Sequence, residues 1–397
     1  MKGEQCIFAF VNEMSVVGII FSNIHDKNIP ELTKSRTMAS IPFGGRYRLI
    51  DFPLSNMVNS GITNIGVIAH SNYRSLMEHI GTGKDWDLAR RSGGIKVLPP
   101  YVTAFANSSN SLYTTRLEAL IGINEFISGC TEDYVVLSDG DTVCNFDIKA
   151  MVEYHQSTGA DATFAVKRQF AAKSSKGNFG TMPKNHLIIE SDDSGRITDV
   201  ASYTDSAVSE YCDIYMNICV MRKRYLEELL YDASAHGYKS FYRDVIAKNM
   251  IKDDYRVYNY NGYFTSIDTL YAYYFCNMDL LSSTFRKQLL KSEKRPIYTS
   301  VQNSPPTVYK STAEVKNSLV ADGCIIEGKV ENSILFRGVK IGKGTTVSNC
   351  ILMQDTLTGE NVDLRYVICD KKVVIRDGRL LCGCERMPLF INKEAIV

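Results

Sequence analysis

The sequence has no glycine between Gly18 and Gly44, directly after its first long apolar run. That run, at 15–21, predicts a buried strand, and the loop that follows it contains Ile24 and Asp26. A loop that binds a triphosphate turns backbone N–H groups toward the anion, which requires glycines that tolerate positive φ and let the ligand approach. The absence of glycine therefore argues against a glycine-rich phosphate loop at this strand end.

The chain also lacks a charge imbalance, a metal-binding cysteine motif and a membrane-spanning run. Lys and Arg number 45 and Asp and Glu 44, so the net charge of +1 indicates neither nucleic acid nor a membrane surface as a partner. The 11 cysteines include no C-x-x-C pair, and the spacing of Cys382 and Cys384 suits neither a zinc knuckle nor a thioredoxin motif. Scattered thiols, and an N-terminal segment without the pattern of a signal peptide, predict a reduced, cytoplasmic protein.

Residues 1–295 alternate short apolar runs with amphipathic segments, which is typical of a mostly parallel sheet with crossover helices. The pattern predicts strands at 15–21, 64–69, 95–98, 133–138 and 161–167, and helices at 51–60, 115–127 and after Asp147. Asp147 is a predicted N-cap. The strand-to-helix junction at 138–147 is where an open α/β sheet binds ligands, beyond the carboxyl ends of its strands.

Residues 296–397 have a different pattern. The prolines of 304–306 predict a stiff linker, and apolar residues then recur every six positions between glycines. The two series are Ile341, Val347 and Met353, and Val362, Ile368, Val374 and Leu380. This period predicts a hexapeptide parallel β-helix, whose stacked coils share one apolar column, with a small antiparallel domain as the alternative. Because the coils are few, we expect them to pack on the first domain or on another subunit.

One block resembles a known family. Residues 42–52 read Pro-Phe-Gly-Gly-Arg-Tyr-Arg-Leu-Ile-Asp-Phe, and Leu-Ser-Asn follows at 54–56. The block is similar to the signature of glucose-1-phosphate adenylyltransferases (ADP-glucose pyrophosphorylases), and the order of domains matches across nearly the whole chain. The resemblance implies a Rossmann-like α/β nucleotidyltransferase domain of GT-A type at 1–295, followed by a left-handed parallel β-helix at 296–397. It also implies a reaction of glycogen synthesis, in which ATP and glucose 1-phosphate give ADP-glucose and pyrophosphate with Mg²⁺.

The two motifs of that family nearest the N-terminus are altered in this chain. The pattern G-G-x-G-x-R-L places Asn23, Ile24 and Asp26 where glycines belong, and Asn28 where the arginine belongs. The block R-A-K-P reads Arg-Thr-Met-Ala, so Met38 replaces the lysine. An aspartate repels a triphosphate and a thioether neutralises none of its charge.

Three later motifs differ as well. The segment G-T-A-D-A beneath the nucleobase reads Thr-Arg-Leu-Glu-Ala, which places the bulky Arg116 where the base would approach. Tyr203 lies near the sugar-phosphate lysine of V-E-K-P, and Ser266 replaces the second metal aspartate of W-R-D-V-G-T. Asp268 lies two residues further on, where we expect the next helix to begin. Asp141 is the one metal carboxylate retained, and a turn or helix-cap role is its alternative.

Charged groups are thus lost while the framework is kept. This pattern resembles the non-catalytic, regulatory subunit that partners a catalytic paralogue in a heterotetramer in some bacteria, and it implies little or no activity for this chain alone. An active nucleotidyltransferase with an altered loop is the alternative. A hexapeptide acyltransferase is disfavoured, because no histidine follows His236 to serve as the base.

Five basic residues are candidates for binding an anionic effector, namely Arg46, Arg48, Arg365, Lys371 and Lys372. The resemblance implies that their regions meet at the domain interface and bind a sugar phosphate or phosphate. A solvated basic face is the alternative. Among single residues, His25 is able to contact an anion when protonated, whereas Trp86 is expected to pack in the core.

Overall fold

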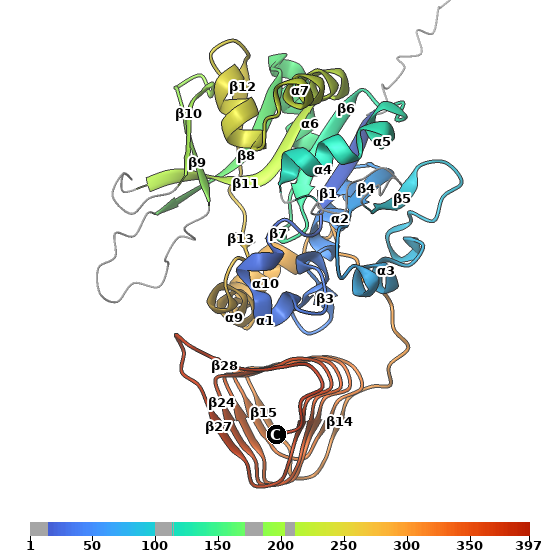
Figure 1. Cartoon of the computed structure of the whole chain (residues 1–397). Helices are drawn as coiled ribbons and strands as arrows, with labels where there is room; N and C mark the ends of the chain where they lie inside the picture. The colour runs from blue at the N-terminus through green and yellow to red at the C-terminus, as the bar shows by residue number, and fades with distance from the viewer. Residues whose placement is uncertain (1–14, 100–112, 114, 171–185, 203–210) are drawn as a thin grey trace, which may run out of the picture.

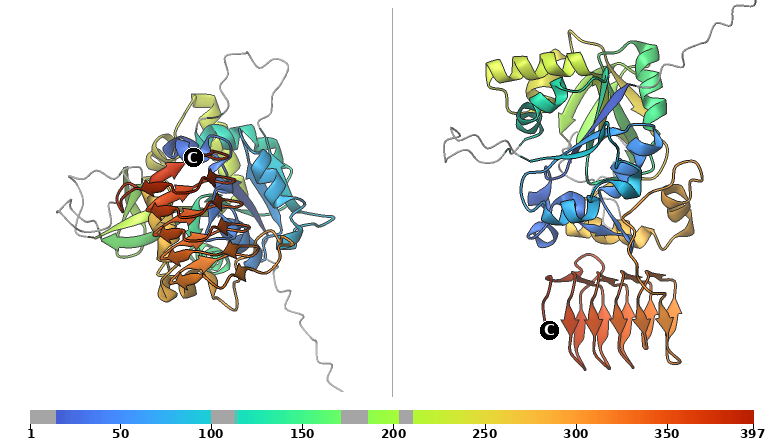
Figure 2. Two further views of the ribbon diagram at one scale, coloured as in Figure 1. Left: turned by 90° about the horizontal axis from the view of Figure 1, so that it is seen from below. Right: turned by 90° about the vertical axis from the view of Figure 1, so that its right-hand side faces the viewer.

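In the computed structural model, an α/β domain lies against a triangular β-helix (Figure 1). The described residues are 15–99, 113, 115–170, 186–202 and 211–397. Figure 2 shows the β-helix from two further sides, with its coils stacked along one axis and one flank turned toward the α/β domain.

The α/β domain is built on a nine-stranded sheet. Its order is β10-β9-β11-β6-β1-β4-β5, and β8 pairs with β11 and β12. The strands are β1 (Val16–Phe21), β4 (Asn64–Ile68), β5 (Gly94–Leu98), β6 (Tyr134–Asp139), β8 (Ala162–Phe170), β9 (Leu187–Ser191), β10 (Ile197–Ser202), β11 (Tyr211–Arg222) and β12 (Tyr255–Asn259). All five predicted strands are present. The expected mostly parallel sheet is instead mixed, since four of its eight pairings are antiparallel, three of them made by β11.

Helices cover both faces of this sheet. α2 (Asp51–Asn59) and α6 (Ile148–Thr158) pack on one face, and α4 (Arg116–Gly122), α5 (Asn124–Ser128) and α7 (Lys223–His236) pack on the other. The predicted helix at 51–60 is confirmed, and so is the N-cap, because the Asp147 side chain accepts a hydrogen bond from the Ala150 N–H. The predicted helix at 115–127 is divided at Ile123.

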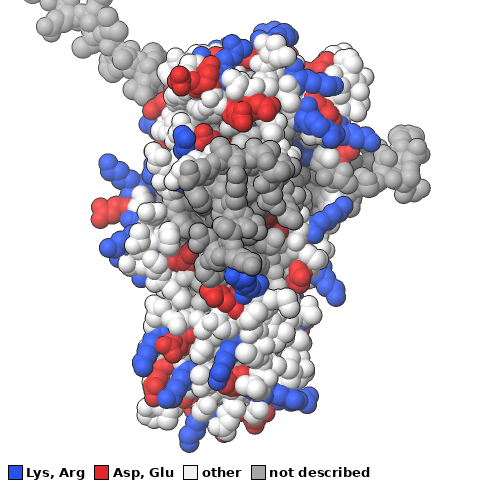
Figure 3. Space-filling view, turned by 90° about the vertical axis from the view of Figure 1, so that its left-hand side faces the viewer, with Lys and Arg blue, Asp and Glu red and all other residues white. Residues whose placement is uncertain are grey.

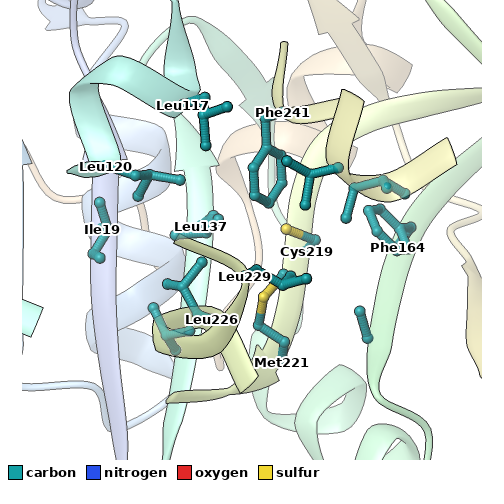
Figure 4. Close-up of a cluster of buried hydrophobic side chains, with 14 of the residues drawn as sticks. Ile19, Leu117, Leu120, Leu137, Phe164, Cys219, Met221, Leu226, Leu229 and Phe241 are labelled. Atoms are coloured by element: carbon teal, nitrogen blue, oxygen red, sulfur yellow. The ribbon is translucent and has the colours of Figure 1, made fainter. Parts of the chain in front are cut away.

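The start of α4 is held in place by its cap and by its apolar side. Thr115 and Glu118 form a capping box, in which each side chain bonds the other's backbone N–H. Leu117 and Leu120 pack in the buried cluster between the sheet and α7 (Figure 4). The first residue of the helix, Arg116, is therefore held beside the carboxyl end of β6.

Shorter elements connect these layers. They are η1 (Asp26–Asn28), α1 (Pro30–Thr33), η2 (Met38–Ser40), β2 (Pro42–Phe43), β3 (Tyr47–Arg48), α3 (Arg74–Ile80), η3 (Lys84–Trp86), β7 (Thr142–Cys144), η4 (Phe241–Ile246), α8 (Ala247–Asn249), β13 (Phe264–Ser266), α9 (Leu270–Asp279) and α10 (Ser283–Leu290). β13 pairs with β7 beneath the carboxyl ends of the main sheet. Trp86 is buried and packs edge-on against His79, as its expected core role requires.

The second domain is a parallel β-helix of three five-stranded sheets. Its strands are β14 (Val308–Tyr309), β15 (Glu314–Lys316), β16 (Leu319–Val320), β17 (Ile325–Ile326), β18 (Lys329–Glu331), β19 (Ile334–Leu335), β20 (Lys340–Ile341), β21 (Thr346–Ser348), β22 (Ile351–Leu352), β23 (Leu357–Thr358), β24 (Asp363–Arg365), β25 (Val367–Cys369), β26 (Val374–Ile375), β27 (Leu380–Cys382) and β28 (Leu389–Ile391). Every third strand pairs in parallel. This confirms the left-handed hexapeptide β-helix that the resemblance implies and excludes the antiparallel alternative.

One of the two predicted six-residue series does not stay in the buried column, because its last residue, Leu380, faces outward. Leu380 is 68% exposed, because it pairs with Asp363 at an outward position while Leu381 pairs with the buried Leu364. Equivalent residues on successive coils, such as Lys340 and Leu357, lie 17 positions apart, which is not a multiple of six. The six-residue register therefore slips from coil to coil.

The two domains share a buried apolar cluster. Leu32, Met38 and Phe43 of the α/β domain pack with Phe336 and Met353 of the β-helix. The expected packing of the β-helix on the first domain is thus confirmed. Within the described ranges, no helix is long and apolar enough to cross a bilayer. Basic and acidic side chains intermingle on the face seen in Figure 3.

Candidate functional site

A cleft of about 520 Å³ lies at the carboxyl end of β6 and beside the middle of the antiparallel strand β11, at the edge of the sheet where the junction at 138–147 predicts a ligand site. Its lining includes His25, Asn28, Arg116, His186, Asn217, Tyr242, Arg243, Ser266 and Asp268. Figure 1 shows that the elements carrying these residues come from distant parts of the chain. We call this space the cleft.

Four charged or titratable side chains on one side of the cleft contact one another. Arg116 bonds both carboxylate oxygens of Asp139, one through Nη2 and one through Nε at 3.1 Å. The Nδ1 atom of His25 lies 2.6 Å from Oδ2 of Asp141 and 3.8 Å from Oδ2 of Asp139. Nη2 of Arg116 also lies 3.3 Å from Nε2 of His25. These four residues are called the ion-pair network below.

The ion-pair network is largely shielded from solvent. The two carboxylates are 2% and 3% exposed, and the side chains of Arg116 and His25 are 14% and 20% exposed. Burial raises the pKa of Asp139, and Arg116 and His25 only partly oppose that rise. Burial also acts to raise the pKa of Asp141, but the charge and hydrogen bond of His25, the charge of Arg116 and a backbone hydrogen bond together outweigh it, so the Asp141 pKa is lowered.

His25 responds in the opposite sense. Burial lowers its pKa, but Asp141 and Asp139 together outweigh burial and leave the pKa raised. Within the chain, His25 contacts the Asp141 carboxylate, and its contact with a bound anion stays a prediction.

The aromatic ring of Tyr242 packs against the guanidinium of Arg116, and Tyr215 bonds Tyr242 in turn. The guanidinium carbon lies 5.3 Å from the ring centroid of Tyr242, a cation–π distance. The hydroxyl of Tyr242 donates a hydrogen bond to that of the buried Tyr215 at 3.3 Å. Arg116 therefore lies between a π face and a carboxylate and points toward Asp139.

The residues present do not fit the magnesium ion that the resemblance implies. Donor atoms of His25, Asp139 and Asp141 lie within 4.8 Å of one another, which is close enough for a shared ion. Both oxygens of Asp139 already bond Arg116, however, and Oδ2 of Asp141 bonds His25. A nitrogen in the set is also unlike the oxygen ligands that Mg²⁺ prefers.

The altered loop after β1 is closed by its own side chains. Asn23 donates to Asp26 at 2.5 Å and accepts from the His70 N–H at 3.0 Å. The other oxygen of Asp26 accepts from the Met38 N–H at 2.7 Å. Burial raises the Asp26 pKa to about 6. The Asn23 side-chain amide and the backbone N–H groups of Met38 and His70 are thus bonded within the chain.

The remaining predicted positions are distributed as follows. Met38 is 2% exposed in the cluster between the domains, so it packs as a core residue. Ser266 and Asp268 both line the cleft, and burial raises the Asp268 pKa to about 6. The expectation that a helix begins at Asp268 is wrong, because α9 begins at Leu270. Tyr203 lies outside the described residues.

Three of the five effector candidates meet at a small pocket between the domains. Arg46, Arg48 and Lys371 line it together with Arg337, and its volume is about 30 Å³. We call it the interface pocket. Lys371 is partly buried, and burial followed by the charges of Arg48 and Arg36 lowers its pKa to about 7.

Arg365 and Lys372 do not line this pocket. Arg365 lies on β24 and forms a solvent-exposed ion pair with Asp363 at 2.7 Å. The strand that follows Lys371 is β26, which belongs to a different sheet of the β-helix. Lys372 is exposed and has φ 59°. The prediction for these two residues came from the family resemblance, which places their region at the domain interface but does not decide which side chains of a coil face it.

Sequence reasoning did not identify Asp139 or Arg337. Asp139 was seen only as part of the segment around Asp141, since nothing local indicates that its partner is Arg116. Arg337 lies in a β-helix turn before Gly338, and its position opposite Arg46 depends on how the two domains pack.

Comparison with known proteins agrees with the motifs. Residues 27–201 match the family model described as nucleotidyl transferase, and residues 306–386 match the model described as GlmU-like, C-terminal hexapeptide. The chain is 34% identical over 390 residues to the glycogen biosynthesis protein GlgD of Bacillus subtilis, covering 98% of each protein. It is 32% identical over 395 residues to a glucose-1-phosphate adenylyltransferase of Clostridium perfringens, covering 98% of this chain and 95% of that one. A glucose-1-phosphate adenylyltransferase of Halalkalibacterium halodurans is 34% identical over 336 residues, or 84% of each chain.

Proposed function

The chain belongs to the family of glucose-1-phosphate adenylyltransferases and GlgD, and we propose that within this family it is a regulatory or structural subunit in glycogen biosynthesis, not an autonomous enzyme. The observation that carries the proposal is the ion-pair network, in which Arg116 and His25 occupy the carboxylates that a metal ion would need.

Cations for a triphosphate are also scarce in the cleft. Among the described lining residues, Arg116 is bonded to Asp139, and Arg243 pairs with Asp244 at 3.2 Å in an exposed position. Burial lowers the His186 pKa to about 4, so this imidazole is neutral at physiological pH. Removing one preorganised electrostatic group from an active site costs about 10²–10³ in kcat, and several are replaced here.

The partner in this proposal is a catalytic glucose-1-phosphate adenylyltransferase paralogue, joined in a heterotetramer in the cytoplasm with Mg²⁺ bound by the catalytic chain. One observation supports the partnership and another supports the compartment. Relatives of both names align over nearly the whole chain, so the two kinds of protein share one domain order. The ten described cysteines are thiols and eight of them are buried, which suits a reducing compartment.

Kinetic assay of the purified chain, alone and mixed with a catalytic paralogue, tests this role. We expect little or no ADP-glucose synthesis by the chain alone, co-elution of the two chains, and a changed maximal rate or effector response in the mixture. Calorimetry with ATP and Mg²⁺ then separates lost binding from lost chemistry. Substantial synthesis by the chain alone would show that it is the active nucleotidyltransferase of the alternative hypothesis.

We also propose that the interface pocket binds an anionic effector, either phosphate or a sugar phosphate. Supporting this, Nε of Arg337 is buried without a hydrogen-bond partner, although Asp322 lies 3.9 Å from it. Three cations, Arg48, Arg36 and Lys393, act on Lys371 against one carboxylate, Asp370. The double variant Arg46→Ala/Arg48→Ala should lose most of the effector response of the mixed enzyme. Arg365→Ala is the matched control, because Arg365 is a basic residue outside the pocket, and it should leave the response unchanged. Equal responses in both variants would remove the pocket from consideration.

A further inference from the structure

We propose that Arg116, assisted by His25, takes the place of a divalent cation between Asp139 and Asp141, so that the chain closes its cleft around an internal cation and binds no metal there. The inference rests on the proposed non-catalytic role and gives a physical reason for it.

The first step is the need for a positive charge at this position. Asp139 ends β6, and Asp141 follows it two residues later, so both carboxylates project from one strand end. Both are almost fully buried. Two buried carboxylates this close repel each other and require a counter-charge or a shared proton. Arg116 supplies that charge through two hydrogen bonds to Asp139.

The second step is that Arg116 is held in this position. Helix α4 begins at this residue with a capping box, and its next turn is anchored in the apolar cluster of Figure 4. Tyr242 lies beneath the guanidinium, and Tyr215 bonds the Tyr242 hydroxyl. A planar guanidinium that is fixed from two sides loses little freedom when it bonds a carboxylate. It behaves as a fixed part of the cleft.

The third step concerns the second carboxylate. His25 lies on the loop after β1 and donates from Nδ1 to Asp141 at 2.6 Å, while its other ring nitrogen faces Arg116. The loop after β1, the start of α4 and the end of β6 are thereby joined through side chains. These segments frame the cleft, so the network holds its shape without a ligand.

A divalent ion cannot bind beside this network without displacing it. The ion would need the oxygens that Arg116 and His25 already bond, and the guanidinium charge would repel it. Removing Arg116 should therefore free the carboxylate of Asp139 for a metal, while His25 stays bonded to Asp141.

Binding of Mn²⁺, followed by its electron paramagnetic resonance signal, tests the inference in the full-length protein. We expect no detectable Mn²⁺ binding at this site in the unmodified chain. Arg116→Ala should bind one ion, with a Kd at least tenfold below the lowest value that the measurement on the unmodified chain allows. Arg243→Ala is the matched control, since Arg243 lines the same cleft but contacts neither carboxylate. Adding Asp139→Asn to Arg116→Ala should abolish the gained site.

A thermal melt of the same variants provides the second readout. Without metal, Arg116→Ala should melt at a lower temperature than Arg243→Ala, and Mn²⁺ should restore part of the difference only in Arg116→Ala. Arg116→Lys keeps a charge at the position and should gain no Mn²⁺, which preserves the test if the alanine variant does not fold.

Two results would overturn the inference. One is tight binding of Mn²⁺ by the unmodified chain that Asp139→Asn abolishes. The other is a folded Arg116→Ala that gains no Mn²⁺ and melts like the control. Neither result decides the non-catalytic role, which the kinetic assay tests separately. ADP-glucose synthesis by the chain alone would contradict that role, but it would not show that a metal binds at this site.

Discussion

Replacing Asp370 with asparagine should weaken the joint between the two domains. Nη2 of Arg36, which lies between α1 and η2, donates to both oxygens of Asp370, directly after β25, at 2.7 and 2.8 Å. The two side chains are 3% and 4% exposed. The pair is therefore buried, charged and shared by residues that are 334 positions apart.

The magnitude follows from what remains after the change. Arg36 would stay buried without its counter-charge, and the positive side chains of Lys371 and Arg48 act on the same region. Breaking a buried ion pair by removing one partner costs about 3–5 kcal/mol. Asparagine keeps one acceptor oxygen, so we expect a loss near 3 kcal/mol in the free energy of unfolding. The double variant Arg36→Met/Asp370→Asn removes both charges and should cost about 2 kcal/mol less than the sum of the single changes.

Urea unfolding measures these losses with two probes. Fluorescence of Trp86, the single tryptophan, reports on the α/β domain, and far-ultraviolet circular dichroism reports on both domains. We expect one shared midpoint in the unmodified chain and, in Asp370→Asn, lower midpoints that separate between the probes. Asp363→Asn breaks the exposed pair with Arg365 and is the control, with an expected cost of at most about 1 kcal/mol. The reasoning is refuted if Asp370→Asn costs no more than this control, or if the double variant costs the full sum.

Further predictions concern a titrating lysine, a β-helix glycine and the closed loop. Because burial lowers the Lys371 pKa to about 7, phosphate binding at the interface pocket should weaken as pH rises from about 6 to about 8, and calorimetry on Lys371→Met should show a flatter profile. Gly342→Ala should destabilise the β-helix by more than about 2 kcal/mol in a urea melt, because the added Cβ would lie 2.1 Å from a backbone oxygen. Gly378→Ala is the control. No atom lies within 4 Å of its added Cβ and only the positive φ opposes alanine, so we expect a cost of about 1 kcal/mol. The Asp26 pKa is raised from 3.8 to about 6, so between pH 4 and pH 6 the folded state holds a proton on Asp26 that the unfolded state has lost. The contribution of Asp26 to the free energy of unfolding therefore falls as the pH rises from about 4 to about 6. In a pH series of urea melts, Asp26→Asn should remove that part of the slope, and an unchanged slope would contradict the raised pKa.

Much of the architecture could be predicted from local patterns. The apolar run at 15–21 became β1, Asp147 capped α6 as its position before an amphipathic segment predicted, and the six-residue period produced a β-helix. These features depend on neighbours within a few residues, where backbone preference and side-chain period act directly. Even there, Leu380 shows the limit, because coils whose spacing is not a multiple of six move a residue from inside to outside.

The motif replacements at Asn23, Asp26 and Met38 could also be read from the sequence, since they concern which chemical groups are present. What those groups do was decided by tertiary structure. Arg116 was expected only to obstruct a base, yet it bonds Asp139, 23 residues away, and Arg36 bonds Asp370 across the domain interface. Residue type sets which charges a chain carries, but a buried charge takes the partner that folding brings within hydrogen-bond distance, and no local pattern encodes that choice.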